Sequence, residues 1–96
     1  MSIYYDKSGA PIDMLTWASL FEDHANRQIA RTVIGDVCVS TVWLGMNHSF
    51  GSGPPLIFET MVFGGALDGD CERYHTEAEA LHGHEEMVKR AGGGPR

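Results

Sequence analysis

Two apolar, β-prone runs joined by a polar, glycine-rich loop constrain this sequence more than any other feature. The runs are Val37–Leu44 and Leu56–Phe63, and their residue types, bounded by Gly and Pro, predict two core strands. The connecting loop Asn47–Pro55 carries Asn47, His48, Ser49 and Phe50 beside glycines and prolines. Because rigid strands hold the groups of a connecting loop in place, we interpret this loop as a candidate functional site.

A β-hairpin is predicted just before this loop. Gly35-Asp36 is a two-residue turn with glycine first, and it joins Arg27–Ile34 to Val37–Leu44. In that register Ile34 faces Val37 and Arg31 faces Ser40, so the side chains alternate between two faces. The face expected to pack on the helices carries Ala30, Thr32, Ile34, Val37, Val39, Thr41 and Trp43. The face expected to meet solvent, a ligand or a partner carries Arg27, Ile29, Arg31, Val33, Cys38, Ser40 and Val42.

Helical spacing predicts two helices. Asp13 is a good N-cap for a helix over Asp13–Asp23, whose buried face would carry Met14, Trp17, Leu20 and Phe21. Thr76 and Glu79 fit a capping box at the start of a helix over Glu77–Ala91. Its inward stripe is expected to hold Ala80, Leu81, His84, Val88 and Ala91, and Gly83 indicates close packing or a bend.

These elements predict an α+β fold, with an antiparallel sheet of four or five strands and two helices packed on one face. Met1–Tyr5 and Asp70–Tyr74 are the expected short strands. A chain of 96 residues is long enough for one modest core, so we expect a single domain over residues 1–91 and a flexible tail over residues 92–96. The apolar strand Leu56–Phe63, if it lies at a sheet edge, needs cover, which predicts a homo-oligomer.

Composition excludes some classes of partner. The net charge of −6 opposes binding to a nucleic-acid backbone, which needs clustered Lys and Arg. No apolar run approaches the roughly 18 residues that span a bilayer, and no signal peptide is evident, so we expect no membrane partner and a reduced cytosolic location. Cys38 is then a small core hydrophobe, although a Cys38–Cys71 disulfide stays open.

The candidate chemistry favours binding over catalysis. We expect no metal site, because His82 and His84 lie on different sides of the predicted helix, and no cofactor, because no phosphate-binding loop is present. His48 with Asp70 or Glu72 as acidic partner and Ser49 as nucleophile is the catalytic alternative, without a G-x-S-x-G motif to support it. The predicted ligand site lies at the loop end of the sheet and suits an anionic, planar molecule. Its residues are Arg27, Arg31, Trp43, Asn47, His48, Phe50 and Arg73.

Three strings, VSTVWLGMNHSFG, GPPLIFETMVF and DCERYHTEAEALHGHE, carry a resemblance to a set of small bacteriophage and prophage proteins. The resemblance covers most of the chain and implies an accessory protein that interferes with host systems. We therefore expect a non-enzymatic binding protein in the host bacterial cytosol, which sequesters a nucleotide-like immune signal or inhibits a host defence protein. The alternatives are a small hydrolase or nucleotide-modifying enzyme that uses His48, and a purely structural interaction module.

Overall fold

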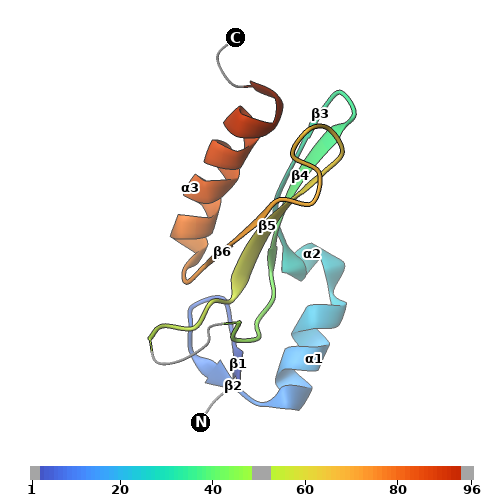
Figure 1. The fold of residues 1–96 in the computed structure, drawn as a ribbon. Coiled ribbons are helices and arrows are strands. Elements are labelled where there is room, and N and C mark those ends of the chain that lie inside the picture. The colour runs from blue at the N-terminus through green and yellow to red at the C-terminus, as the bar shows by residue number, and fades with distance from the viewer. Residues whose placement is uncertain (1–2, 49–52, 94–96) are drawn as a thin grey trace.

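One helix covers a four-stranded antiparallel sheet in this structure (Figure 1). The computed structural model describes residues 3–48 and 53–93. The sheet strands are β3 (Gln28–Ile34), β4 (Val37–Trp43), β5 (Phe58–Phe63) and β6 (Cys71–Tyr74), in that spatial order. The remaining elements are β1 (Tyr4–Tyr5), β2 (Pro11–Ile12), α1 (Met14–Glu22), α2 (His24–Arg27), α3 (Glu77–Val88) and a π-helical turn at Lys89–Gly93. The predicted α+β class is confirmed.

The hairpin register is the predicted one over most of its length. Ile34 pairs with Val37 and Arg31 with Ser40, and only Gly35 in the turn has a positive φ, 57°, as a type II′ turn requires. Trp43 lies fully buried on the α3 side of the sheet, on the same face of β4 as Val39 and Thr41. The prediction that this face packs on a helix is confirmed.

The register changes at the start of β3, where the sequence prediction was wrong. Gln28 pairs with Val42 and Ala30 with Thr41, so Ile29 is an extra, bulged residue. The bulge turns Ile29 toward the core, where it packs beside buried residues of the sheet. The Gln28 amide nitrogen donates to the Ala30 and Thr41 carbonyl oxygens, at 2.8 and 3.0 Å, which stabilises the bulge. Arg27 belongs to α2, not to the strand.

Helix α3 packs on the sheet through small residues. Its buried residues are Ala80, Gly83, His84 and Met87, whereas Leu81, predicted to face inward, is 44% exposed. Large side chains rise from the sheet at this place, so only a small residue fits above them. A Cβ at Gly83 would overlap the Tyr74 ring, which confirms the predicted close packing.

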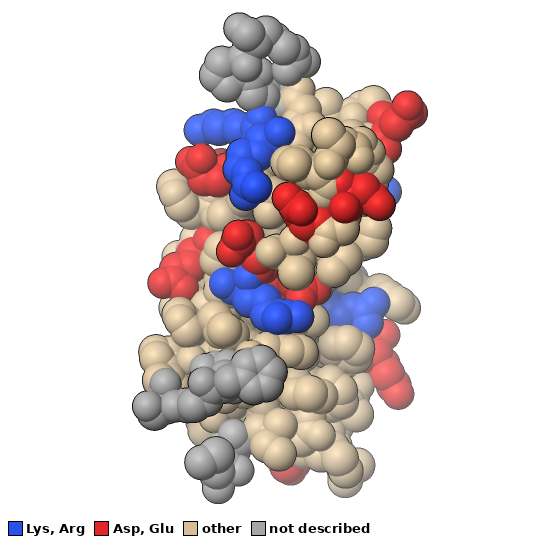
Figure 2. Space-filling view, in the orientation of Figure 1, with Lys and Arg blue, Asp and Glu red and all other residues tan. Residues whose placement is uncertain are grey.

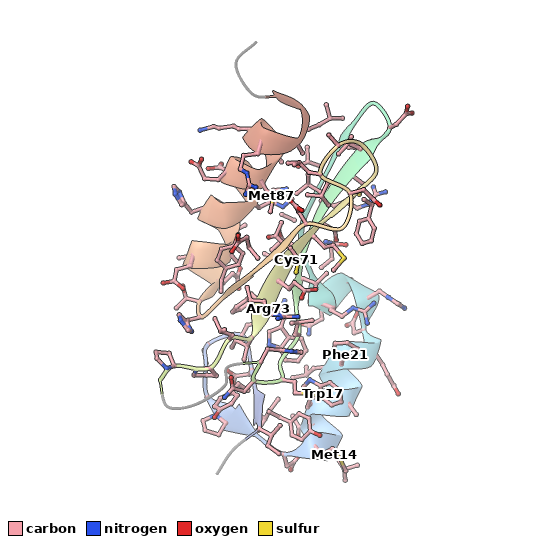
Figure 3. All side chains as sticks on the ribbon, viewed as in Figure 1. Met14, Trp17, Phe21, Cys71, Arg73 and Met87 are labelled. Carbon is pink, nitrogen blue, oxygen red and sulfur yellow. The ribbon has the colours of Figure 1, made fainter. Side chains whose placement is uncertain are left out.

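Helix α1 lies beyond one end of the sheet rather than over it (Figure 1). Asp13 caps it as predicted, since its carboxylate accepts from the Thr16 backbone N–H at 2.7 Å. The Trp17 ring contacts the rings of Tyr4 and Phe21, with centroids 4.8 and 4.9 Å apart (Figure 3). Met14 was expected to be buried but is 57% exposed, because only the aromatic side of α1 meets the rest of the protein. Packing of both helices on one face is therefore not confirmed.

Two further predictions need correction. Strand β5 lies inside the sheet between β4 and β6, so the apolar run at Leu56–Phe63 is not at an edge. Thr76 caps α3 by accepting from the Glu79 N–H at 3.1 Å, as a capping box requires. The Glu79 carboxylate, however, accepts from the His75 N–H, one residue before the expected donor.

Replacing Gly83 by alanine tests the packing of α3. The added methyl group meets the Tyr74 ring, and such overpacking costs about 1–3 kcal/mol in a core. This exceeds the roughly 1 kcal/mol that alanine gains over glycine in a helix, so Gly83→Ala is expected to lower the free energy of unfolding. Denaturant unfolding measures it, with His82→Ala on the exposed side of the same helix as the matched control. A more stable Gly83→Ala protein would contradict the close approach.

Candidate functional site

A chain of hydrogen-bonded polar side chains crosses the sheet beneath α3. His84 Nε2 lies 2.9 Å from Thr32 Oγ1 on β3, and His84 Nδ1 lies 2.7 Å from Thr41 Oγ1 on β4. Thr41 Oγ1 hydrogen-bonds Thr60 Oγ1 on β5, and Thr60 also hydrogen-bonds the Tyr74 side chain on β6. One helical residue is thereby connected to all four strands of the sheet.

Burial favours the neutral form of His84. Its side chain is buried among the sheet and helix, and this desolvation lowers the pKa of the imidazole below its usual value, against a smaller opposite effect of the Glu85 carboxylate. A neutral imidazole has one N–H donor and one bare nitrogen acceptor, so one threonine hydroxyl accepts from it and the other donates to it. Both ring nitrogens are therefore satisfied without a ligand.

An open groove of about 910 Å³ lies between α3 and β3, directly over this histidine. His84 and Thr32 form part of its floor. Its other lining residues are Ala30, Arg31, Leu81, Glu85, Val88 and Lys89. The groove thus combines apolar walls with a rim that carries both signs of charge, which is the usual character of a binding site.

The groove borders an edge of the sheet, because among residues 3–48 and 53–93 β3 pairs with β4 alone. In a hairpin closed by two residues, the flanking pair Ile34 and Val37 is the hydrogen-bonded one, and the pairs then alternate. Arg31 and Val33 therefore direct their backbone N–H and C=O groups away from β4, toward the open edge. Backbone groups at such an edge are ready to pair with another extended segment.

The predicted loop-end site is not assembled as expected. Trp43 is fully buried and donates from Nε1 to the Tyr5 carbonyl oxygen at 3.2 Å, so its ring has no surface for a ligand. The Asn47 side-chain oxygen accepts from the Leu56 N–H at 3.2 Å, and the His48 N–H donates to the Leu56 carbonyl. These contacts give the loop a structural role. Phe50, and Ser49 of the catalytic alternative, lie outside the described residues.

The three predicted arginines lie in different places. Arg27 lies over the Phe21 ring, 4.6 Å from its centroid, and hydrogen-bonds the Phe21 carbonyl. Arg73 donates from Nε to Glu59 Oε2 at 3.0 Å across neighbouring strands. Arg31 is exposed and lines the groove, and of the predicted ligand residues that the structure describes it is the one found there. His84 was predicted to face inward but was not among the predicted site residues, although one inward threonine on each of three strands (Thr32, Thr41 and Thr60) was a signal for a buried polar network.

The acidic partners predicted for His48 lie far from it. The His48 N–H donates to the Leu56 carbonyl just before β5, and the Asp70 carbonyl accepts from the Val62 N–H near the far end of that strand. Six residues of extended chain separate Leu56 from Val62, which corresponds to roughly 20 Å. Asp70 instead forms an ion pair with Arg90, with 3.6 Å between the charged atoms. Glu72 pairs with Thr60, which lies about four residues along the chain from Leu56, so Glu72 is also distant from His48. The predicted acid–base arrangement is therefore not present.

The cysteines and histidines do not form a combined site in the part of the chain that is described. Cys38 and Cys71 are both free thiols, and β5 lies between their strands, so a disulfide within the chain is excluded by distance. Across residues 3–48 and 53–93, no three His, Cys, Asp or Glu side chains are grouped to hold a metal ion. Within the same residues, no helix has both the length and the apolar character needed to cross a bilayer.

Fold and groove together define a small α+β protein in which an open groove lies beside a strand that no other described strand pairs with on that side. Searches against protein-family models, curated proteins and solved structures found no match to this chain.

The buried histidine predicts a dependence of stability on pH. The pKa of His84 is lower in the folded protein than in the unfolded chain, where it is about 6.5. The unfolded chain therefore takes up more protons as the pH falls below this value, and folding loses stability down to the lowered pKa. Unfolding free energies measured above and below pH 6.5 should show this loss, and His84→Asn should show less of it. An equal loss in both proteins would assign it to other groups.

Proposed function

We propose that this protein is a phage-type accessory protein that acts by binding a host protein, without catalysis. The observation that carries the proposal is the groove between α3 and β3, which is open to solvent and lies next to backbone groups of β3 that no described strand pairs with. The resemblance of the sequence to small phage and prophage proteins supports a host target and action in the host bacterial cytosol. Interference with a host defence protein is the role that fits such a binder.

The chemistry of the groove supports binding rather than turnover. Its most reactive group, His84, is buried, neutral and hydrogen-bonded through both ring nitrogens. A general base needs a free nitrogen within reach of the proton that it removes. The groove instead offers apolar surface from Leu81 and Val88, which suits side chains of a protein partner.

An anionic small molecule, such as a nucleotide-like signal, is the second candidate ligand. Arg31 and Lys89 on the groove rim favour it. Lys89 already lies 3.8 Å from Glu86, and Glu85 adds a negative charge to the same rim. The net attraction for an anion is therefore small, and a protein partner is the better fit.

Blocking the groove should remove the proposed interference with host defence while leaving the fold intact. Leu81→Arg places a long charged side chain at the rim, where the leucine is 44% exposed, and Leu15→Arg makes the same change at a 78% exposed position on α1. The chain and both variants are expressed in bacterial strains that restrict phage growth, and plaque formation by the restricted phage is counted. We expect the chain and Leu15→Arg to restore plaques, and Leu81→Arg to restore at least about tenfold fewer.

The stoichiometry of inhibition separates binding from catalysis. Once a target has been purified, a binder inhibits it in proportion to the amount added and reaches full inhibition near one copy per target. Full inhibition by a small fraction of one equivalent would indicate turnover and contradict the proposal. Equal plaque counts for Leu81→Arg and Leu15→Arg, with equal thermal stability, would exclude the groove. A small molecule found by mass spectrometry on the purified chain and absent from Leu81→Arg would favour the second candidate.

A further inference from the structure

The groove between α3 and β3 reaches the edge of the sheet itself. Thr32 faces α3, since its hydroxyl hydrogen-bonds His84, and the preceding residue, Arg31, therefore belongs to the opposite side of the strand. Both residues line the groove, so the groove extends from the helix around the backbone of β3. A partner that occupies the groove consequently lies against strand backbone as well as against side chains.

The outer backbone groups of β3 form a short, regular row. The N–H and C=O groups of Arg31 and Val33 point away from β4, and in the described part of the chain no other group hydrogen-bonds to them. The row ends on one side at the Ile29 bulge. On the other side the C-terminal turn approaches it, since a Cβ at Gly92 would lie 3.1 Å from Ile34 Cγ2. The accessible edge is therefore the regular part of β3 between the bulge and this turn.

Arg31 lacks the acidic neighbour that other basic residues of the protein have. Figure 2 shows basic side chains lying beside acidic ones on the viewed face. Arg73 forms an ion pair with Glu59, and Arg90 with Asp70. Arg31 is exposed, and no carboxylate of the described residues forms an ion pair with it. An acidic residue of a partner, placed opposite Arg31, would supply the missing charge.

We propose that the groove binds an extended segment of the host protein, which adds to the sheet as an antiparallel strand beside β3. The inference rests on the proposed function and names the kind of partner that the same groove takes. Arg31 and Val33 each donate one backbone hydrogen bond to the segment and accept one from it. Extended peptides bind to exposed sheet edges in this way, with affinity from the main chain and specificity from alternate side chains.

The register specifies three neighbouring residues of the segment. The residue opposite Val33 is apolar, because Val33 is 56% exposed and gains a cross-strand contact from it. The next residue lies opposite Thr32, and its side chain points to the α3 side, where Leu81 and Val88 line the groove. The third residue lies opposite Arg31 and is acidic. Because the strands run antiparallel, the segment has the order apolar, apolar, acidic from its N-terminal side.

A synthetic peptide tests this pairing directly. The probe is acetyl-Ser-Thr-Val-Leu-Glu-Thr-Ser-amide, in which valine, leucine and glutamate occupy the three specified places. Its titration into the chain is followed by NMR of the backbone amides, and the signals of Arg31 and Val33 should shift. So small a contact binds weakly, so we expect a dissociation constant in the high-micromolar range. A lack of binding, or shifts confined to other parts of the chain, would overturn the proposal.

Methylation of single peptide nitrogens separates strand pairing from simple occupation of the groove. An N-methyl group on the peptide's glutamate removes the N–H that donates to the Arg31 carbonyl, and should weaken binding about tenfold. An N-methyl group on the peptide's leucine is the matched control. That N–H points away from β3 in this register, so the affinity should stay nearly unchanged. Equal effects of the two methyl groups would contradict the strand pairing.

Charge exchange tests the acidic place in the segment. Arg31→Glu should weaken binding of the glutamate peptide, and a peptide with lysine in place of that glutamate should bind this variant better than the glutamate peptide does. Lys89→Glu, which makes the same change in net charge at another lining residue of the groove, should not show this exchange of preference. If Arg31→Glu keeps the preference of the unchanged chain for the glutamate peptide, the proposed register is wrong.

Val33→Pro extends the test to the host and separates it from the proposed function. Proline removes the outward N–H of Val33 and leaves the pairing with β4, so a variant of unchanged thermal stability should restore about tenfold fewer plaques than the chain. Val33→Thr, which keeps the N–H, is the matched control and should restore plaques like the chain.

The outcomes distinguish the two proposals. Loss of plaques with Leu81→Arg but not with Val33→Pro would overturn the strand pairing and leave the groove as the binding site. A failure of the unchanged chain to restore plaques in any restricting strain would contradict the proposed function, whereas the peptide experiments decide the strand pairing without a host. A dimer of the chain that forms with rising concentration and is lost in Val33→Pro would assign the edge to a second copy and overturn the host segment.

Discussion

The contact of His84 with Thr32 and Thr41 determines how α3 sits on the sheet, and the candidate groove depends on it. Both hydrogen bonds are made by buried or half-buried groups, so breaking them leaves polar atoms unsatisfied at a cost of about 1–3 kcal/mol each. Rotation of the helix would break both at once. With His84 held inward, Leu81 necessarily points to the side, where it forms one wall of the groove rather than part of the core.

The two faces of the sheet differ in the residues they carry and in what packs on them. The face under α3 contains large aromatic side chains and the hydrogen-bonded hydroxyl groups of Thr41 and Thr60. The buried residues of α3 above it are the small Ala80 and Gly83 together with His84 and Met87. The opposite face carries Val33, Cys38, Met61, Phe63 and Cys71, and no described helix or strand lies over its upper part in Figure 1.

Local features were predictable because they follow from neighbouring residues. The Gly35-Asp36 turn specifies a tight hairpin, and the pairing of Ile34 with Val37 assigns Trp43 to the covered face several residues away. The caps of both helices are likewise local, since Asp13 and Thr76 bond backbone groups three residues on. The bulge at Ile29 was not predictable in this way. It depends on the Gln28 side chain reaching two carbonyl groups and on space in the core for Ile29, which are contacts between distant residues.

The sequence by itself determined the α+β class, the two-residue hairpin and the face on which Trp43 is buried, because strand periodicity and turn geometry act over a few residues. Only the tertiary structure decided which side of α3 faces the sheet. The helical pattern allows either Leu81 or Met87 inward, and the choice depends on the space left beside Tyr74 and on hydroxyl groups that can bond His84. It also decided that the predicted ligand arginines separate, since Phe21 holds Arg27 and Glu59 holds Arg73. The side chains that bind these arginines lie on other helices and strands, so a local sequence pattern cannot predict the contacts.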